Sequence, residues 1–439
     1  MARHRAPFPR TSQDAFDRAS ARVLERLLDM DALVFENSLP RLAVTRILAA
    51  VSRRAFVGPL APMTLQEIPE PGFPAADWVR LRARLCGICG SDYKQVFLNG
   101  RRDNPMTALV SFPHVLGHEV VATVDAVGPG VKHRRPGERV VLNPWLSCAP
   151  RGIEPPCRAC AEGRLSLCEN FLHGVLPAGI HTGNCATATG GFAPFLPAHE
   201  SQCIPVPDGV SDEAAVLADP FSVSLHAIVD SPPQGPAALV YGCGTLGLLS
   251  IAILRLLHPE VKVIAVARFT HQATLASALG ASMVVPWRPV EGIVEAVAKA
   301  TGAERLTPWY GRPWLLGGVA TTYDTVGSPE TIEVGVRVTR ARGAIVVTGV
   351  EMPARFEWTP LYFKELRIVG SNAFGRERLN GSAKHAMEFY FDFVRDRGLD
   401  VTAIITHRYA LAQYRDAFLA CYDQGASGAV KVVFAYPPA

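Results

Sequence analysis

The sequence predicts an α/β protein in which a β-rich, barrel-like domain accompanies a doubly wound parallel sheet. Short β-like runs broken by Gly and Pro fill residues 56–235, a pattern typical of an all-β domain. Strand and helix patterns then alternate over residues 236–370, which favours a parallel sheet covered by helices. The 439 residues suit about two such domains, at roughly 150 residues each.

The composition excludes several classes of protein. The formal net charge is only +4 and the basic residues are spread along the chain, so we expect no nucleic-acid partner. No apolar run approaches the roughly 20 residues that cross a bilayer, so we expect no membrane segment. The N-terminus lacks the apolar core of a signal peptide, which favours a cytoplasmic location. In that reducing compartment the cluster Cys148, Cys157, Cys160 and Cys168 would bind metal rather than form disulfides.

Residues 1–55 are expected to form a helical N-terminal extension that serves docking or oligomerisation. Apolar residues recur there at helical spacing, with Ser12 or Asp14 available as caps. The spaced residues are Phe16, Val23, Leu27, Met30 and Val34. A second apolar-rich segment, 42–51, is expected to pack on the body of the protein.

The β-rich domain is expected to take up two stretches of the chain, 56–235 and 371–439. The predicted strands of the first stretch lie at 78–85, 120–128, 138–144 and near 203–209. In the C-terminal stretch a helix is predicted near 410–422 and a final strand at 430–435. The tail therefore completes the first domain.

Residues 236–370 are expected to form the parallel sheet. A strand at 238–242 leads into an apolar helix at 245–257, and a second strand follows at 261–267. Further strands are predicted at 283–286, 322–327 and 343–350, with a helix between the first of these and Arg268.

A glycine fingerprint stands between the first strand and the first helix of this domain. Gly242 permits the tight turn, Gly244 lets the backbone approach a pyrophosphate, and Gly247 allows close packing of helix on sheet. The helix that begins near Thr245 offers free N–H groups to phosphates. The predicted cofactor-binding residues of this loop are Gly242, Gly244, Thr245, Leu246 and Gly247.

The end of the second strand favours NADP over NAD. An acidic residue there would bind the adenosine ribose hydroxyls of NAD, but this chain has Ala267 and Arg268, with His271 close behind. An arginine suits a 2′-phosphate. The alternative is that Arg268 stacks on adenine while NAD binds.

A thiol, an imidazole and two carboxylates predict a zinc site with one open position. Cys89 and His118 are the best two ligands, and Glu119 could bind or exchange with water beside the metal. Asp219 is a further candidate, just before the dinucleotide domain. Cys86 is the rival of Cys89, which is preferred because Ser91 and Asp92 follow it.

These motifs resemble the zinc-dependent medium-chain alcohol dehydrogenase superfamily, in its polyol and threonine dehydrogenase-like branch. The resemblance rests on GICGSD (87–92), GHE (117–119), ADPFSVSLHA (218–227) and GCGTLG (242–247), and it covers about 56–439. Weaker similarity lies at 323–331, 364–371 and 427–434. It implies a GroES-like catalytic domain, a Rossmann domain, and a dimeric or tetrameric assembly.

The resemblance also assigns roles within the metal site. By this resemblance Cys89 and His118 are expected to bind the catalytic zinc. Asp219 takes the place of an acidic ligand or of a residue that supports the ligands. Ser91 matches the hydroxyl that relays a proton from the bound alcohol. Lys94 stands where many members continue the relay with a histidine, so a complete relay is in doubt.

Four further cysteines resemble the structural zinc lobe of the family. The usual spacing is Cys-x2-Cys-x2-Cys-x7-Cys, and Cys157, Cys160 and Cys168 fit it. Eight residues, 149–156, lie between Cys148 and Cys157, so this inserted stretch must bulge out to bring the Cys148 thiol back. Loss of the zinc, leaving free thiols, is the alternative.

We therefore expect an oxidoreductase in which zinc polarises the oxygen of a small alcohol, ketone or aldehyde and hydride passes to or from NAD(P). The alternatives are a reductase acting on a non-alcohol substrate and a catalytically silent protein that binds nucleotide and zinc. An insertion-like stretch at 306–318 carries Trp309, Tyr310 and Trp314. We expect it to form a surface hairpin or an oligomer contact rather than a wall of the cofactor cleft.

Overall fold

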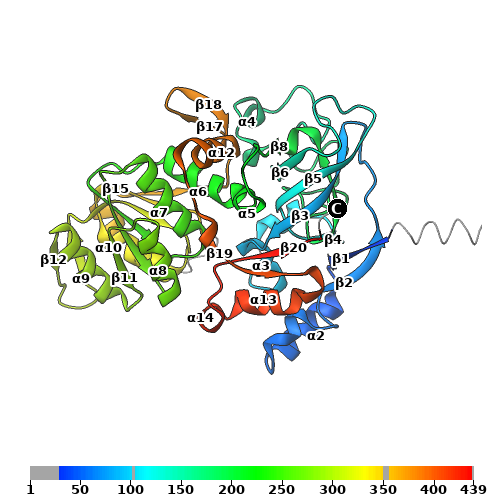
Figure 1. The fold of residues 1–439 in the computed structure, drawn as a ribbon. Helices are drawn as coiled ribbons and strands as arrows, with labels where there is room; N and C mark the ends of the chain where they lie inside the picture. The colour runs from blue at the N-terminus through cyan, green and yellow to red at the C-terminus, as the bar shows by residue number, and fades with distance from the viewer. Residues whose placement is uncertain (1–28, 101–103, 350–354, 438–439) are drawn as a thin grey trace, which may run out of the picture.

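The computed structural model describes residues 29–100, 104–349 and 355–437, which form two bodies that lie side by side (Figure 1). One body is built on a six-stranded parallel sheet and the other on a seven-stranded sheet. The C-terminal segment returns to the second body, where β20 (Lys431–Ala435) lies between β19 (Ile405–Tyr409) and β3 (Trp78–Gly87), a strand from the first third of the chain (Figure 1). The predicted α/β class is thus confirmed.

The β-rich body contains a sheet of order β19-β20-β3-β5-β6-β8, with β7 also paired to β3. Its strands are β3 (Trp78–Gly87), β5 (Glu119–Val127), β6 (Arg139–Leu142), β7 (Phe195–His199), β8 (Cys203–Pro205), β19 (Ile405–Tyr409) and β20 (Lys431–Ala435). Apolar residues of β3 alternate with arginines, and the apolar set is buried. Antiparallel pairing of β20 with β3 sets Phe434 opposite Cys86.

The expected helical character of the N-terminal extension is wrong for residues 29–35. These form a strand, β1 (Asp29–Phe35), which pairs antiparallel with β2 (Met63–Pro69) and β4 (His114–Val115). Met30 and Val34 are buried within it, because the apolar run 32–35 is covered on both faces. The expected cap and spacing residues Ser12, Asp14, Phe16, Val23 and Leu27 lie outside the described residues.

The second N-terminal segment packs on the body less than expected. It forms α2 (Leu39–Ala49), in which Thr45 is the only fully buried residue. Thr45 donates a hydrogen bond to the Leu60 carbonyl at 3.3 Å. Ile47 remains 70% exposed, so the helix presents an apolar face to its surroundings.

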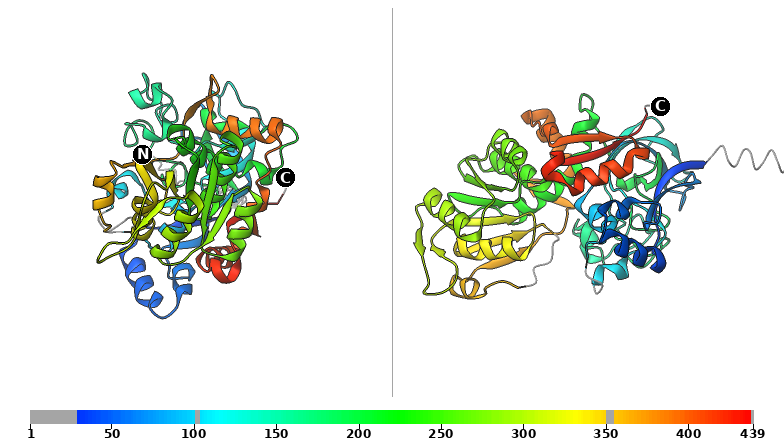
Figure 2. Two further views of the ribbon diagram at one scale, coloured as in Figure 1. Left: turned by 90° about the vertical axis from the view of Figure 1, so that its left-hand side faces the viewer. Right: turned by 90° about the horizontal axis from the view of Figure 1, so that it is seen from below.

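The parallel sheet has the order β11-β10-β9-β14-β15-β16, with helices on both faces (Figure 2). Its strands are β9 (Ala237–Tyr241), β10 (Lys262–Ala267), β11 (Met283–Pro286), β14 (Val319–Asp324), β15 (Thr339–Val347) and β16 (Arg367–Gly370). Its helices are α7 (Thr245–Leu257), α8 (Thr270–Ala278), α9 (Val290–Thr301) and α10 (Pro329–Val338). Alternate residues of β9 pack to opposite faces: Val240 with α7 and α8, and Leu239 with α9 and α10.

The remaining elements connect and cover these sheets. They are α3 (Gly90–Val96), α4 (Arg158–Ala161), α5 (Asp212–Ala215), α6 (Ala218–Asp230), β12 (Glu304–Leu306), β13 (Trp314–Leu316), α11 (Thr359–Phe363), β17 (Arg376–Leu379), β18 (Ser382–His385), α12 (Ala386–Arg397), α13 (Tyr414–Tyr422) and α14 (Gln424–Ser427). Among the described residues, no helix has the length and apolar character needed to cross a bilayer.

The stretch 306–318 forms most of an antiparallel hairpin between β12 and β13. Trp309 and Tyr310, at its tip, are 99% and 95% exposed. Trp314 instead packs edge-on against Phe363 of α11 at 5.4 Å. The stretch is therefore the surface hairpin that we expected.

A lysine buried beneath this hairpin gives the fold a pH dependence. Lys364 is 2% exposed and donates hydrogen bonds to the carbonyls of Arg337 and Thr339, at 3.0 and 2.6 Å. Burial, with the Arg337 charge adding to it, lowers its pKa from 10.5 to about 7. Between these two values the unfolded chain binds a proton that the folded chain does not, so stability rises with pH.

We expect Lys364→Met to abolish this part of the pH dependence. Each pH unit inside the window corresponds to about 1.4 kcal/mol. The free energy of unfolding is measured with urea at pH 7.5 and at pH 9. Between these two pH values the wild-type protein should gain about 2 kcal/mol more stability than the variant gains. Equal gains in the two proteins would show that Lys364 keeps an ordinary pKa.

Candidate metal centre and cofactor loop

The structure brings Cys89, His118 and Glu119 together. Cys89 caps the N-terminus of α3 directly after β3, and Glu119 begins β5. The antiparallel pairing of these strands sets Gly87 opposite Glu119, so the residues that follow β3 meet those that precede β5. One potential ligand atom from each of the three side chains lies within 4.8 Å of the others. A thiol, an imidazole and a carboxylate at this spacing suit zinc.

Lys431 completes this cluster and was not foreseen. Its ammonium, 3% exposed, forms an ion pair with Glu119 Oε2 and donates to the Ile88 carbonyl at 3.1 Å. Gly87 makes room, because a Cβ there would lie 2.1 Å from Glu119 Oε2. The available signal was a single charged residue inside the apolar terminal strand β20.

Asp92 lies against the imidazole of His118. Its carboxylate accepts hydrogen bonds from the backbone N–H groups of Cys89 and Gly117, at 3.0 and 3.4 Å. Its Oδ1 lies 3.8 Å from His118 Nδ1. A carboxylate behind a ligating histidine fixes the orientation and tautomer of the ring. Sequence reasoning gave Asp92 no such role.

Asp219, on α6, lies near the cluster but outside the group of three. It is buried, and among the described residues its Oδ2 has no hydrogen-bond partner. Burial raises its pKa to about 7, and the charges of Glu119 and Asp92 add to the rise while His118 opposes it.

One ring nitrogen of His118 also lacks a hydrogen-bond partner. Its Nδ1 is buried without a hydrogen bond among the described residues. Burial works against the charged imidazole, but Cys89 and Asp92 outweigh it and raise the pKa of His118. Because Nδ1 faces Asp92, the other ring nitrogen is the one available to a metal. The unpartnered Asp219 Oδ2 beside a thiol and an imidazole fits a bound cation, because leaving a buried polar atom unsatisfied costs free energy.

The remaining residues predicted near this site take separate positions. Ser91 is exposed in the first turn of α3, and Lys94 lies partly buried in the last turn. Cys86 is fully buried in β3, where its thiol contacts the Gly87 carbonyl at 3.7 Å. Burial raises the pKa of Cys86. Cys89 rather than Cys86 therefore joins the cluster.

His181 is a neighbour of the cluster that the sequence gave no reason to select. The centroid of its ring lies 4.6 Å from that of His118. Its Nδ1 lies 2.7 Å from the Thr182 carbonyl. Burial lowers its pKa to about 3, and the charge of His118 adds to this effect.

The four cysteines of the second site converge as expected. The thiols of Cys148, Cys157, Cys160 and Cys168 lie within 4.8 Å of one another. Two of the sulfur pairs, Cys148–Cys168 and Cys157–Cys168, are separated by 3.6 and 3.9 Å. A tetrahedral zinc with bonds of about 2.3 Å holds its sulfurs about 3.8 Å apart, so these thiols fit the metal.

The inserted stretch 149–156 bulges out and returns Cys148 to the lobe. Arg151, at its centre, is fully buried and serves as its anchor. The guanidinium donates hydrogen bonds to the carbonyls of Leu146, His173, Leu176, Pro177 and Gly179. A single side chain thus holds the insertion in the lobe.

The glycine loop runs from the end of β9 to the start of α7. Gly242 has a φ of +93°, which disfavours other residues. A Cβ on Gly247 would lie 1.7 Å from the Gly242 carbonyl oxygen, so the helix packs directly on the loop. A Cβ on Gly244 would meet nothing within 4 Å, which leaves its backbone open to a ligand.

The loop also meets the β-rich body and the end of β10. Thr245 Oγ1 donates to the Val430 carbonyl at 3.4 Å, and the Leu246 carbonyl accepts from Ser224 at 3.0 Å. After β10, Arg268 is exposed, with its guanidinium 5.4 Å from the Phe269 ring. His271 stacks on the same ring at 5.5 Å.

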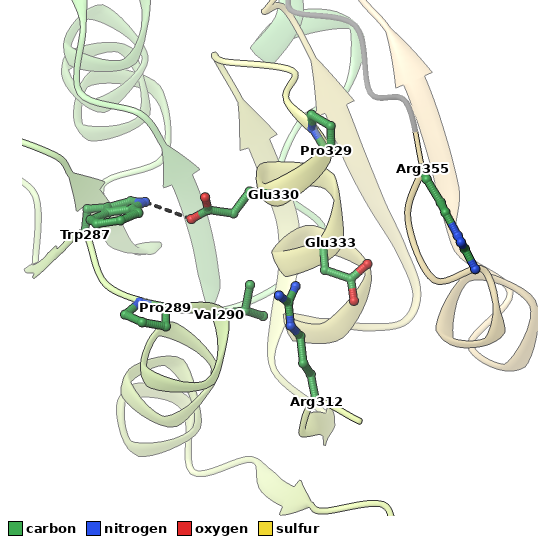
Figure 3. A pocket seen from close by; sticks show the side chains of 8 residues that line it. All are labelled: Trp287, Pro289, Val290, Arg312, Pro329, Glu330, Glu333 and Arg355. Carbon is green, nitrogen blue, oxygen red and sulfur yellow. Dashed lines mark hydrogen bonds between the residues drawn. The ribbon is translucent and has the colours of Figure 1, made fainter. Parts of the chain in front are cut away.

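A cavity of about 390 Å³ lies at the carboxyl end of β11 and the N-terminus of α10 (Figure 3). The Trp287 indole donates to Glu330 at 2.8 Å on one side of it. None of the predicted site residues lines it. It lies at the edge where parallel sheets commonly bind ligands.

Comparisons with known proteins agree with this arrangement. Residues 75–208 match the alcohol dehydrogenase GroES-like domain family, and residues 245–389 match the zinc-binding dehydrogenase family. An L-threonine 3-dehydrogenase of Rhizobium etli is 28% identical over 87% of this chain and 97% of its own length. A sorbitol dehydrogenase of Arabidopsis thaliana is 28% identical over 81% of this chain and 88% of its own.

Solved structures share the fold. An Escherichia coli alcohol dehydrogenase, RspB, bound to NADH, has a TM-score of 0.68 at 22% identity, covering 93% of this chain and 99% of its own. A putative zinc-binding dehydrogenase of Sinorhizobium meliloti, bound to NADP, has a TM-score of 0.67 at 24% identity, with the same coverage.

Proposed function

Because this chain belongs to the zinc-dependent medium-chain dehydrogenase superfamily, we propose that it oxidises a small-molecule alcohol, or reduces the matching ketone or aldehyde, with NADP as the favoured cofactor. The observation that carries this proposal is the meeting of Cys89, His118 and Glu119 beside a buried aspartate with a free oxygen.

Cys89 and His118 are the proposed zinc ligands, and zinc bound there would supply the Lewis acid that polarises the substrate oxygen. Asp219 is the better candidate for a third ligand than Glu119. The reason is that Glu119 Oε2 is already paired with Lys431, whereas Asp219 Oδ2 has no hydrogen-bond partner among the described residues. Glu119 would then lie beside the metal as an exchangeable ligand.

The other side chains hold this arrangement and move the proton. Asp92 orients the His118 ring, and Lys431 holds Glu119 in place through their ion pair. Ser91, exposed two residues after Cys89, carries the substrate proton outward. The backbone N–H groups at the start of α7 would hold the pyrophosphate of the bound cofactor.

Arg268 supports the preference for NADP. It is exposed at the end of β10, where it can reach a 2′-phosphate, and Ala267 leaves no carboxylate there to hold ribose hydroxyls. We expect NADP to raise the thermal midpoint of the zinc-loaded protein more than NAD at equal concentration, because tighter ligands stabilise more. Arg268→Ala should raise the dissociation constant of NADP about tenfold or more and leave the dissociation constant of NAD unchanged. A larger midpoint shift with NAD would contradict the preference.

A turnover assay tests the reaction itself. Zinc-loaded protein with NADP should form NADPH when supplied with secondary alcohols and diols, and should consume it with ketones and aldehydes. Protein with verified zinc and bound NADP that transfers no hydride to or from any of these would support the silent binding protein instead. Reduction of carbon–carbon double bonds alone would support the reductase of non-alcohol substrates.

We further propose a cytoplasmic homodimer or homotetramer. Free cysteine thiols, all ten of them in the structure, suit a reducing compartment. Among the described strands, β16 lies at the edge of the sheet and has one unpaired side, and exposed aromatic residues lie on the β12–β13 hairpin and on α11. These residues are Trp309, Tyr310, Tyr362 and Phe363.

A further inference from the structure

The connection between β1 and β2 is much longer than the pairing of these two strands requires. Phe35 lies opposite Met63 at the end of the antiparallel pair, which a tight turn of a few residues could close. Residues 36–62 stand there instead, and they form α2 followed by a 3-10 helix, Arg53–Val57. They lie outside both stretches that match the dehydrogenase families. Long surface connections of this kind commonly have a function of their own.

The side of α2 that faces solvent is apolar. Leu39, Ala43 and Ile47 follow one another at a spacing of four, which places them on one face of the helix, and all three are exposed. Val51, just beyond the helix, continues this apolar stripe and is 91% exposed. Thr45, on the opposite face, is buried against the body of the protein. A surface helix normally shows the reverse pattern, with its polar residues toward water.

The charged residues around this stripe are all positive. Residues 37–66 contain four arginines, no lysine and no acidic residue. Arg46, three residues after Ala43, borders the stripe, and Arg54 follows the helix. Both are exposed, and neither forms an ion pair within the described part of the chain. An exposed apolar face bordered by arginines is typical of helices that lie on anionic lipid surfaces.

Two other occupants fit this face less well. One face of the 11-residue helix covers only roughly 200 Å². A stable dimer buries about 800 Å² on each partner, and a symmetric contact would also bring the same arginines of two copies together. Residues 1–28 contain six arginines and three acidic residues, so their net positive charge opposes a position on this cationic face.

We propose that α2 docks this protein on membranes that contain anionic lipid. The apolar stripe enters the boundary between headgroups and acyl chains, and the neighbouring arginines contact the negatively charged headgroups. The docking is peripheral and reversible, because the inserted area is small. In Figure 1 α2 lies at the lower edge of the molecule, below α13, where a flat surface can reach it. This role goes beyond the proposed reaction and is independent of it, because the metal cluster lies on other elements.

Flotation of the full-length protein with lipid vesicles tests the proposal. Vesicles of phosphatidylglycerol and phosphatidylcholine in equal parts are compared with vesicles of phosphatidylcholine alone. The variants are Ile47→Glu, in the apolar stripe, and Arg46→Gln, beside it. Trp309→Glu and Arg378→Gln are the matched controls, because these side chains are also exposed but lie on the β12–β13 hairpin and on β17, away from α2 (Figure 1). All four replaced side chains are exposed, so the variants should keep the wild-type thermal midpoint.

We expect wild type to bind the anionic vesicles at least about tenfold more tightly than the neutral ones, because each arginine at an anionic surface is worth about fivefold. Ile47→Glu should weaken binding to the anionic vesicles at least about tenfold, and Arg46→Gln about fivefold. Both controls should bind like wild type.

Three results would overturn the proposal: no binding by wild type, equal binding to both kinds of vesicle, or equal losses in the variants and their controls. A native mass that falls in Ile47→Glu without vesicles, measured by sedimentation, would show instead that a second copy covers this face. Failure of the proposed function would be seen separately, as absence of hydride transfer when zinc and NADP are bound.

Discussion

Replacing His118 by alanine should remove one of two zinc ions and lower kcat/KM by at least about a thousandfold. A nitrogen of the imidazole lies within 4.8 Å of a potential ligand atom of Cys89 and of Glu119, and no other histidine joins that group among the described residues. A metal that polarises the substrate oxygen is worth several kcal/mol, and each 1.4 kcal/mol is about tenfold in rate. Elemental analysis and steady-state kinetics measure the two effects.

The second site and a neighbouring thiol provide the controls for this experiment. The Cys148, Cys157, Cys160 and Cys168 lobe is separate, so the variant should keep one zinc per chain. Cys86→Ala should keep two zinc ions and most of the activity, because the Cys86 thiol is buried outside the cluster. Retention of both metals in His118→Ala, or loss of one in Cys86→Ala, would contradict the ligand assignment.

Replacing Lys431 by methionine should cost about 3–5 kcal/mol of unfolding free energy. The Lys431 and Glu119 side chains are 3% and 2% exposed, and removing one partner of a buried ion pair strands the other charge. Denaturant unfolding of the zinc-loaded protein measures the loss. The double variant Lys431→Met, Glu119→Gln should recover most of it, because the stranded carboxylate is gone.

Lys431→Met should also change the affinity of the metal cluster for zinc. Without Lys431, Glu119 is free to approach Cys89 and His118, so we expect a changed zinc affinity together with the lost stability. Lys364→Met is a suitable comparison, because Lys364 is equally buried but bonds only to carbonyls. If Lys431→Met costs less than about 1 kcal/mol, the pair contributes little and Glu119 is held by other contacts.

Prediction of secondary structure from local pattern was most accurate where the apolar periodicity and the length of a segment indicated the same element. The helix 245–257 was placed to the residue, because thirteen residues of apolar character follow a glycine turn and a buried strand. The same pattern failed at Met30 and Val34. Their four-residue spacing suits a helix. The buried run 32–35 instead pairs with β2 and β4, and both of these strands are remote in sequence, so local spacing could not reveal the pairing.

By itself the sequence determined the two kinds of domain, the glycine loop, and the thiol, imidazole and carboxylate that meet beside β3 and β5. The domains and the loop follow from local periodicity, and the metal-site side chains follow from two short motifs, GICGSD at 87–92 and GHE at 117–119. Only the tertiary structure decided that Lys431 pairs with Glu119, that Asp219 Oδ2 is buried without a hydrogen-bond partner among the described residues, and that His181 lies against His118. Each of these features depends on segments that are far apart in the chain. Burial and strand pairing, rather than local pattern, fix which groups meet there.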